Sequence, residues 1–435
     1  MKPVSRRIDR IEVTFDEPNL VANAGLLLVA TLVTWLDLER LINATVRLVG
    51  RVGGALPGRK VLTLIHAMVA GGTHIDHADV LRSGATSSVL GHRVMAPSTL
   101  GSFLRAFTFG HVRQLDAVLA EALRRAWSLG VGPGADQMVM DLDSTICEVC
   151  GKAKAGAGYG YTHVLGYHPL VATRSHTGEV LHARLRRGAA NTGRGAVRFV
   201  EELVARVRRA GATGELIMRF DSGFWSNRTI ATLERLEVGF TMGVRMQKSV
   251  VSAIASIAES AWTPIVYTPD GEAEVAECEY LGRRLIVRRT RLIGRQATLW
   301  PQWRHFAFVT DLEGHAVDVD AFHREHARVE LAIRDLKEGA GLEHVPSGHF
   351  FANAAWLLCA ALAHDLIRWT AMLGDITPSE HLTVARTVRT RFFSVPGRLV
   401  SRSGTPTLRT PLEWPWADAF LRALDQLRGL PPVPL

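Results

Sequence analysis

One acidic residue, Glu330, stands among basic side chains at helical spacing in the stretch FHREHARVELAIRDLKE, residues 322–338. His326 and Arg334 lie four residues before and after it. His323 and Lys337 lie seven residues before and after it, so a continuous α-helix would place all of them on one face. Such a face suits an acid ringed by phosphate-binding groups, and it also suits a solvated surface with weak ion pairs.

Two further acids follow apolar runs that predict strands. Asp143 precedes Ser-Thr in MVMDLDST, and Asp221 precedes Ser-Gly in LIMRFDSG. Acids at the carboxyl edge of apolar strands are costly unless they are solvated or paired, and α/β sheets collect ligands along that edge. Because side chains alternate along a strand, Asp141 shares a face with Asp143 and stays an alternative to it.

Three carboxylates from Asp143 (or Asp141), Asp221 and Glu330 are hard oxygen ligands that suit Mg²⁺ or Mn²⁺. Two such ions about 3.5 to 4 Å apart serve in-line phosphoryl transfer by activating the attacking oxygen and stabilising the leaving one. The basic residues around Glu330 would then face a nucleic-acid backbone. The phosphate-contact candidates are Lys337, His326, His323 and Arg334.

Trp225 lies four residues after Asp221, where it can stack on an unpaired base or simply pack in a turn. Cys147 and Cys150 have CxxC spacing, but no second cysteine pair follows, so we read them as incidental and not as a zinc site. The glycines of residues 188–195 match neither GxGxxG nor GK[ST], and they predict a loop that leads into a helix.

The N-terminal half divides at about residue 130. Residues 1–130 are predicted to be a helical DNA-binding region, with helices separated by glycine and proline. After Gln137 the pattern predicts three strands, a helix, a strand and a helix, which is an α/β arrangement with a mixed sheet. The expected helices of the first region include 22–36 and 101–129, with Ser98 and Thr99 as caps, and the later elements are strands 138–145, 161–173 and 179–185, helix 195–209, strand 216–220 and helix 227–236.

Residues 244–303 predict a β-rich insertion before the Glu330 helix, with strands at 274–280 and 284–290. The catalytic core is therefore expected in two pieces, residues 131–243 and 304–373. A basic C-terminal region, 374–435, is expected to be strand-like over 384–403. Ala352 to Leu373 is strongly apolar but interrupted by charged residues, so it predicts a buried helix and not a membrane span.

The chain has 435 residues, a net charge of +9 and four cysteines. The length allows two or three domains, and the basic charge favours a polyanionic partner such as nucleic acid over a membrane. Few cysteines and no apolar leader predict a reducing, cytoplasmic setting.

The blocks MDLDST, GYTHVLGYHPL, LRRGAANTGRGA, RFDSGFWS and HREHARVELAIRDLKEGAG, in this order, resemble a bacterial insertion-sequence transposase of the DDE group 1 type. The similarity extends upstream through TFDEPNLVANAGLL and PSTLGSFLRAFTFGHVRQLD, so it covers residues 13–371. The resemblance implies an RNase H-like core, flanked by helices, with Asp143, Asp221 and Glu330 as the metal-binding triad. It also implies a Tyr, Arg, Glu, Lys signature, of which this chain keeps only Glu330 and Lys337.

The resemblance implies an enzyme that binds the terminal inverted repeats of its mobile element, as a homodimer in a synaptic complex close to the nucleoid. It would cleave double-stranded DNA with Mg²⁺ or Mn²⁺ and join the freed 3′ end to target DNA. His323 and His326 stand at the Tyr and Arg positions of the signature. A DNA-binding relative that has lost cleavage, and an RNase H-like nuclease without strand transfer, are the alternatives.

Overall fold

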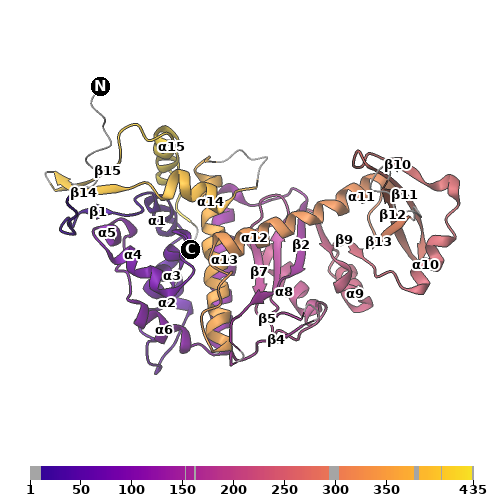
Figure 1. Ribbon diagram of the computed structural model, residues 1–435, viewed down its shortest axis with the longest axis horizontal. Coiled ribbons are helices and arrows are strands. Elements are labelled where there is room, and N and C mark those ends of the chain that lie inside the picture. Colours follow the sequence, from indigo (N-terminus) through magenta and orange to yellow (C-terminus); the bar gives the residue numbers. More distant parts are fainter. Residues whose placement is uncertain are drawn as a thin grey trace.

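The computed structural model describes residues 11–151, 153–160, 163–292, 303–376, 382–402 and 404–433. It is elongated, with the N-terminal helices and the C-terminal elements at one end, a mixed sheet in the middle and an antiparallel hairpin at the other end (Figure 1). The predicted fold class is confirmed: a large mixed sheet is flanked by helices.

The first region is helical, as the sequence predicts. Pro57 and Pro97 stand in the first turn of their helices, where a missing N–H costs no hydrogen bond. The expected helix 101–129 is interrupted at residues 106–108, and the N-cap before it is Ala96, so the predicted caps Ser98 and Thr99 are wrong. The helices are α1 (Leu26–Trp35), α2 (Leu38–Thr45), α3 (Pro57–Val69), α4 (Ala78–Arg82), α5 (Thr86–Leu90), α6 (Pro97–Arg105) and α7 (Phe109–Ala126), followed by a π-helical turn at Trp127–Val131.

The central sheet has the strand order β10-β11-β12-β13-β9-β8-β2-β6-β7. In its middle, β2 (Met138–Ser144) runs parallel to β8 (Leu216–Phe220), which runs parallel to β9 (Gly239–Gly243). On the other side β2 pairs antiparallel with β6 (Leu170–Arg174), and β6 with β7 (Val180–Arg184). Three antiparallel strands followed by two parallel ones give an RNase H-like core.

The expected strand 161–173 is wrong in one respect, because the structure divides it. Residues 161 and 162 lie outside the described residues. Beyond them, β5 (Leu165–Tyr167) joins a small sheet with β3 (Cys147–Glu148) and β4 (Gly158–Tyr159), whereas β6 enters the large sheet. Pro169 separates the two strands, and a residue without an N–H ends a hydrogen-bonded ladder.

The insertion contains the expected hairpin, formed by β11 (Gly271–Tyr280) and β12 (Arg283–Leu292). Its two-residue turn, Leu281-Gly282, has positive φ at both positions, 54° and 71°, as a type I′ turn requires. β10 (Thr263–Ile265) pairs with the outer edge of β11. A short helix, α10 (Lys248–Ala255), precedes these strands.

The insertion strands extend the core sheet. β13 (Arg304–Thr310) pairs with β12 on one side and with β9 on the other, where Phe308 lies opposite Gly243 and Thr310 opposite Thr241. The hairpin is therefore hydrogen-bonded to the core through a continuous ladder. Residues 293–302 of the predicted insertion lie outside the described residues.

Helices cover the sheet. α8 (Ala196–Ala210) packs against β7 and α7, and α9 (Asn227–Arg235) packs against α8. α12 (Arg328–Gly339) crosses β2 and β6 and leads toward α13 (Phe350–Leu373). α13 stands between the N-terminal helices and the sheet and contacts α3, α7 and β7 (Figure 1).

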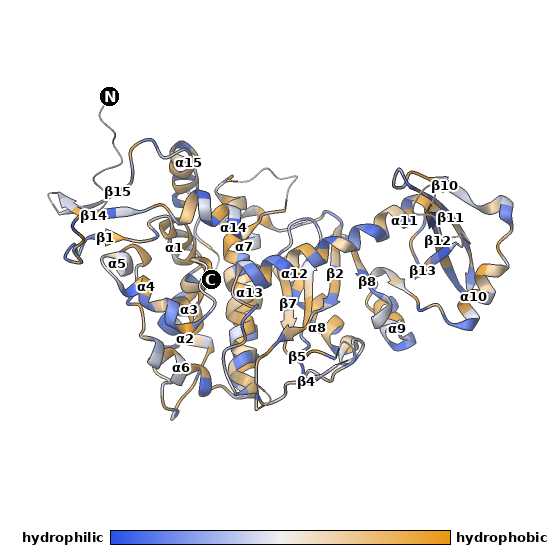
Figure 2. Ribbon diagram, in the orientation of Figure 1, coloured by the Kyte–Doolittle hydropathy of each residue, from blue (hydrophilic) through white to orange (hydrophobic). Residues whose placement is uncertain are grey.

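α13 is the expected buried helix. Every residue from Ala352 to Ala371 is buried, and the apolar colour of α13 continues into the neighbouring helices and β2 (Figure 2). By length and composition it could cross a bilayer, but 89% of its apolar window is buried inside the protein. Two of its charged residues have internal partners: Asp365 accepts the N–H of Val180 at 2.7 Å, and Arg368 donates to Asp335 at 2.9 Å.

The C-terminal region packs on the N-terminal helices. β14 (Gly397–Arg402) pairs with β1 (Leu20–Val21) and with β15 (Thr405–Arg409), and α15 (Ala417–Arg428) contacts α1. The strand predicted for 384–403 is wrong over residues 385–393, which form α14 (Ala385–Val388) and a π-helical turn. Two buried phenylalanines, Phe392 and Phe393, make this segment a packing element.

Glu179 connects the first region to the core. Its Oε1 accepts the indole N–H of Trp127 at 3.0 Å and that of Trp369 at 2.7 Å, and its side chain is fully buried. Thr177 donates to Oε2 at 2.6 Å. One carboxylate thus holds the end of α7, the end of α13 and the start of β7 together.

We expect Glu179→Ala to lower the urea midpoint of unfolding markedly, because it leaves two buried indole N–H groups without an acceptor, at a cost of about 3 kcal/mol or more. The matched control is Glu201→Ala, which removes an exposed pair with Arg235 and should change stability by less than about 1 kcal/mol. Equal midpoints for the two variants would contradict this role of Glu179.

Candidate active site

Two aspartates of β2 point to the same side of the sheet but have different surroundings. Asp141 is fully buried, whereas Asp143 is partly exposed near the carboxyl end of the strand. In the parallel ladder with β8, Asp141 lies opposite Arg219 and Leu142 opposite Phe220. One residue further, Asp143 is therefore level with Asp221, which follows the end of β8.

The strand register and α12 bring two further carboxylates, those of Asp221 and Glu330, into the neighbourhood of Asp143. Burial raises the pKa of the Asp143 carboxyl, and the negative charges of Asp221 and Glu330 raise it further. The N–H of Ser144 and the His326 ring act in the opposite direction. Since such Coulomb effects fade with distance, Asp221 and Glu330 lie near Asp143.

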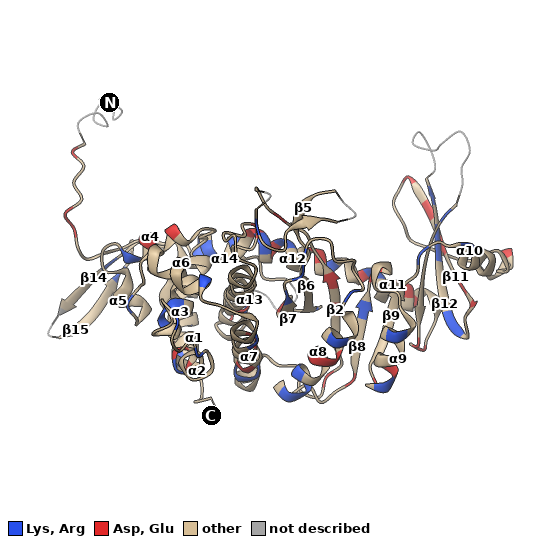
Figure 3. Cartoon of the chain, turned by 90° about the horizontal axis from the view of Figure 1, so that it is seen from below, with Lys and Arg blue, Asp and Glu red and all other residues tan. Residues whose placement is uncertain are grey.

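Glu330 is exposed in the first turn of α12 and lines one cleft together with Asp143. Arg334 and Lys337, one and two turns further along α12, line the same cleft. The Lys337 ammonium donates to the carbonyl of Ile146 at 3.1 Å, which holds it beside the end of β2. Figure 3 shows the acidic end of β2 close to the basic residues of α12.

Arg219 of β8 is a residue that our reading of the sequence missed. It is fully buried and donates to both oxygens of Asp141, at 2.7 and 2.9 Å. It also donates to the hydroxyl of Ser175 and, at 2.7 Å, to the carbonyl of Phe322. The available signal was a charged residue inside the otherwise apolar strand LIMRF.

His323 and His326 do not share an exposed face with Glu330, so the expectation of one continuous helix is wrong. His323 belongs to α11 (Ala316–Arg324), and His326 belongs to a 3₁₀ turn at Glu325–Ala327 that separates α11 from α12. Three residues per turn instead of 3.6 rotate the following residues by about 60°. The same stretch of sequence spaces Val329, Ile333, Leu336 and Ala340 as a second, apolar helical stripe that predicts core packing, and the structure buries all four.

Both histidines point into the protein. His323 Nδ1 lies 2.7 Å from the Thr241 hydroxyl, and its ring stacks on Phe308 at 4.1 Å between centroids. Burial lowers the pKa of His323 to about 3, so the ring is neutral near pH 7. His326 Nδ1 lies 2.8 Å from Asp141 Oδ1, so His326 is a second partner of that carboxylate beside Arg219.

Residues 3–432 match the family described as transposase DDE domain group 1. The chain belongs to this family. Among curated proteins none matches it. Among solved structures, it is similar to a piggyBac transposase in a synaptic complex with hairpin DNA, with a TM-score of 0.44 and 13% identity over 86% of this chain and 79% of that one.

In this transposase, Trp225 lies just beyond Asp221, after the short 3₁₀ turn Ser222–Phe224. Its ring is tilted by 42° against that of Tyr280 at 6.2 Å between centroids. It lines an open cleft and packs on the core with its other atoms. Trp225 thus packs on the core, and its stacking on an unpaired base stays a prediction.

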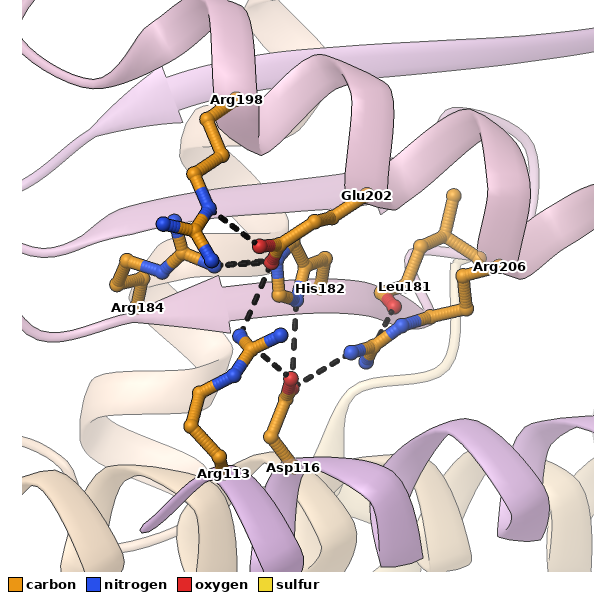
Figure 4. Close-up of polar contacts among 8 residues, drawn as sticks. All are labelled: Arg113, Asp116, Leu181, His182, Arg184, Arg198, Glu202 and Arg206. Atoms are coloured by element: carbon orange, nitrogen blue, oxygen red, sulfur yellow. Dashed lines mark hydrogen bonds and ion pairs between the residues drawn. The ribbon is translucent and has the colours of Figure 1, made fainter. Parts of the chain in front are cut away.

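A second group of side chains has the spacing of a metal site. Ligand atoms of Asp116, His182 and Glu202 lie within 4.8 Å of one another, where α7, β7 and α8 meet (Figure 4). Arginines hold these carboxylates, however. Arg206 donates to Asp116 at 2.6 Å, and Arg113 bridges Asp116 and Glu202 at 3.2 and 3.0 Å.

Two more arginines, Arg184 and Arg198, donate to Glu202. Four guanidinium groups around two carboxylates leave a positive surplus, which repels a divalent cation. We therefore interpret the cluster as an ion-pair network that fastens α7 to the catalytic core. Burial alone would raise the pKa values of Asp116 and Glu202, but His182 and the arginines hold both well below the usual range.

These lowered pKa values predict a loss of stability in acid. A carboxyl whose folded pKa is below its unfolded value stabilises the protein above about pH 4 and loses this contribution as the pH falls through the folded pKa. We expect Glu202→Gln to melt at a lower temperature than the wild type at pH 7, and the difference to shrink below pH 4. Calorimetric scans across this range measure it, and a difference independent of pH would contradict the ion-pair network.

Proposed function

We propose that this transposase cleaves DNA at the terminal inverted repeats of its mobile element and joins the freed 3′ end to target DNA. The observation that carries the proposal is that Asp143 is level with Asp221 at the ends of neighbouring strands and lines one cleft with Glu330. Asp143 and not Asp141 is the proposed first ligand, because both Asp141 oxygens already accept hydrogen bonds from Arg219.

The residues fit a divalent cation. All three proposed ligands supply carboxylate oxygens, which Mg²⁺ and Mn²⁺ prefer. Burial raises the pKa of the Asp143 carboxyl, the charges of Asp221 and Glu330 raise it further, and a cation between the three acids would relieve this repulsion. Two bound ions would supply Lewis-acid activation of the attacking and leaving oxygens.

The chain's own groups position the DNA. Asp143, Asp221 and Glu330 would hold the metal ions, while Lys337 and Arg334 on α12 offer positive charge in the cleft that Asp143 and Glu330 line. Lys337 is fixed against Ile146 and is preorganised for a phosphate oxygen. His323 and His326 support the sheet and the Asp141 carboxylate, so we propose no phosphate contact for them.

Water attacks the scissile phosphodiester first and leaves a 3′-hydroxyl, which then attacks a target phosphodiester and releases its 3′-oxygen. Each step exchanges one P–O bond for another, so no covalent enzyme intermediate is needed. A homodimer that holds both element ends is part of the proposal. A nuclease without strand transfer would cut the same DNA but yield no joined product.

We expect Asp143→Asn, Asp221→Asn and Glu330→Gln each to reduce the cleavage rate by at least about a hundredfold, because each removes a ligand charge that stabilises the transition state by several kcal/mol. The assay is cutting of DNA that carries the element ends, with Mg²⁺ or Mn²⁺, alongside a binding assay that should change little. Cleavage at the wild-type rate by any of the three variants would refute the triad.

A separate prediction concerns phosphate contacts. Lys337→Ala and Arg334→Ala should weaken DNA binding similarly for all sequences and lower the slope of log affinity against log salt by about one each. The control is Arg235→Ala. Arg235 is the last residue of α9, is exposed and pairs with Glu201 of α8, so its removal should leave the slope of log affinity against log salt unchanged. An unchanged slope for Lys337→Ala would mean that it contacts no phosphate.

A further inference from the structure

A second open cleft, of about 750 Å³, begins at the residue after Asp221. Three segments line it: the loop of residues 191–194, the turn of residues 222–226 and residues 244–247, where the core passes into the insertion. The cleft therefore joins directly to the strand end that carries one of the proposed metal ligands. We call it the Trp225 cleft.

The loop that forms one wall is held from behind by a buried arginine. Arg186 is 8% exposed, and its Nη1 donates to the carbonyl oxygens of Asn191, Thr192 and Arg194 at 2.9 to 3.0 Å. Its Nη2 is buried and has no hydrogen-bond partner among the described residues. The loop thus turns its negative carbonyl ends inward, away from the cleft.

The same loop is locked onto the Asp221 turn. A Cβ added at Gly223 would lie 2.8 Å from the methyl carbon of Thr192, and one added at Gly243 would lie 2.8 Å from the backbone nitrogen of Ser222. Such contacts require glycine at both places. The distance from the cleft wall to the Asp221 carboxylate is therefore fixed by backbone packing.

The cleft is positively charged. Arg194 and Arg245 line it with exposed guanidinium groups, and neither group has an ion pair or hydrogen bond with another residue in the described part of the chain. The amino ends of α8, α9 and α10 also begin at its walls, without side-chain caps, and they add partial positive charge. Unpaired arginines of this kind suit phosphate oxygens.

The aromatic side of the cleft is preorganised. The Trp225 ring packs against the ring of Tyr280. The Tyr280 hydroxyl accepts a hydrogen bond from Gln247 at 2.9 Å and lies 3.1 Å from the Ser249 hydroxyl. Tyr280 belongs to the insertion, and Trp225 to the core. The insertion thus fixes the position of an indole ring on the wall of a basic cleft.

We propose that the Trp225 cleft holds an unpaired nucleotide of the DNA strand that reaches Asp221, with its base stacked on Trp225 and its phosphates on Arg194 and Arg245. This inference rests on the proposed function, and it adds single-stranded DNA as the ligand of a distinct cleft. In a duplex both faces of each base are already stacked, so an indole ring is useful only to a base that has left the helix.

The test uses a short DNA duplex whose single-stranded overhang carries 5-iododeoxyuridine, with Ca²⁺ in place of Mg²⁺ or Mn²⁺. Ultraviolet irradiation crosslinks the iodinated base to an aromatic ring that stacks on it, and mass spectrometry locates the adduct. We expect the adduct in the tryptic peptide of residues 220–228, which contains Trp225. Adducts found only elsewhere would overturn the proposal.

Binding measurements provide the second readout. Trp225→Leu should weaken binding of the overhang DNA about tenfold and leave blunt duplex binding unchanged, whereas Trp225→Phe should keep most of the affinity. Trp416→Leu, a half-exposed tryptophan beside Arg391 in the C-terminal region, is the matched control and should change neither. Equal loss for overhang and blunt DNA would show a duplex site and overturn the proposal.

Neither readout requires cleavage, so the two proposals fail separately. If the triad variants still cut while the crosslink forms at Trp225, the proposed catalytic residues are wrong and the cleft stands. If the triad variants lose cleavage while no crosslink forms in residues 220–228, only the cleft assignment falls.

Discussion

The bidentate ion pair between Arg219 and Asp141 is the interaction on which the site depends. Both side chains are fully buried, so the pair tolerates little change in geometry. Arg219 also binds the carbonyl of Phe322, and His326 binds Asp141. Through these contacts, β2, β8 and the segment before α12 are fastened at one point. Asp143 lies on β2, Asp221 directly follows β8, and Glu330 stands in the first turn of α12, directly after the fastened segment.

This arrangement explains how three like charges can be held together. Burial raises the pKa of the Asp143 carboxyl, and the charges of Asp221 and Glu330 raise it further; without support this repulsion would push the elements apart. The support comes from a buried layer beneath them, where opposite charges meet in a low-dielectric interior. The ion-pair network of Asp116, His182 and Glu202 has the same character between α7 and the core. Fixed charge pairs thus hold the frame, and the exposed acids remain available for ligands.

The insertion and the C-terminal region gain their importance from pairing across long distances in the chain. Through β13, the insertion hairpin continues the core ladder, which brings Tyr280 to Trp225. The C-terminal strand β14 pairs with β1 near the opposite end of the chain. Neither part is a loose appendage. Each shapes a surface whose other half comes from a distant segment, and the Trp225 cleft is the clearest case.

The sequence by itself determined the elements whose signals are local: the alternation of the β11 and β12 hairpin, the apolar run of α13, the buried stripe of α12 and the acids at the carboxyl ends of β2 and β8. Tertiary structure decided what depends on distant partners. Alternation places Asp141 and Asp143 on one face, but only the packing of Arg219 makes one buried and paired and the other partly exposed. Helical spacing grouped His323 and His326 with Glu330, whereas contacts with Thr241 and Asp141 turn them inward. The spacing of residues along the chain shows only which of them share a face of a helix or strand. Whether a charged residue on that face can be buried depends on the partners that distant segments bring to it.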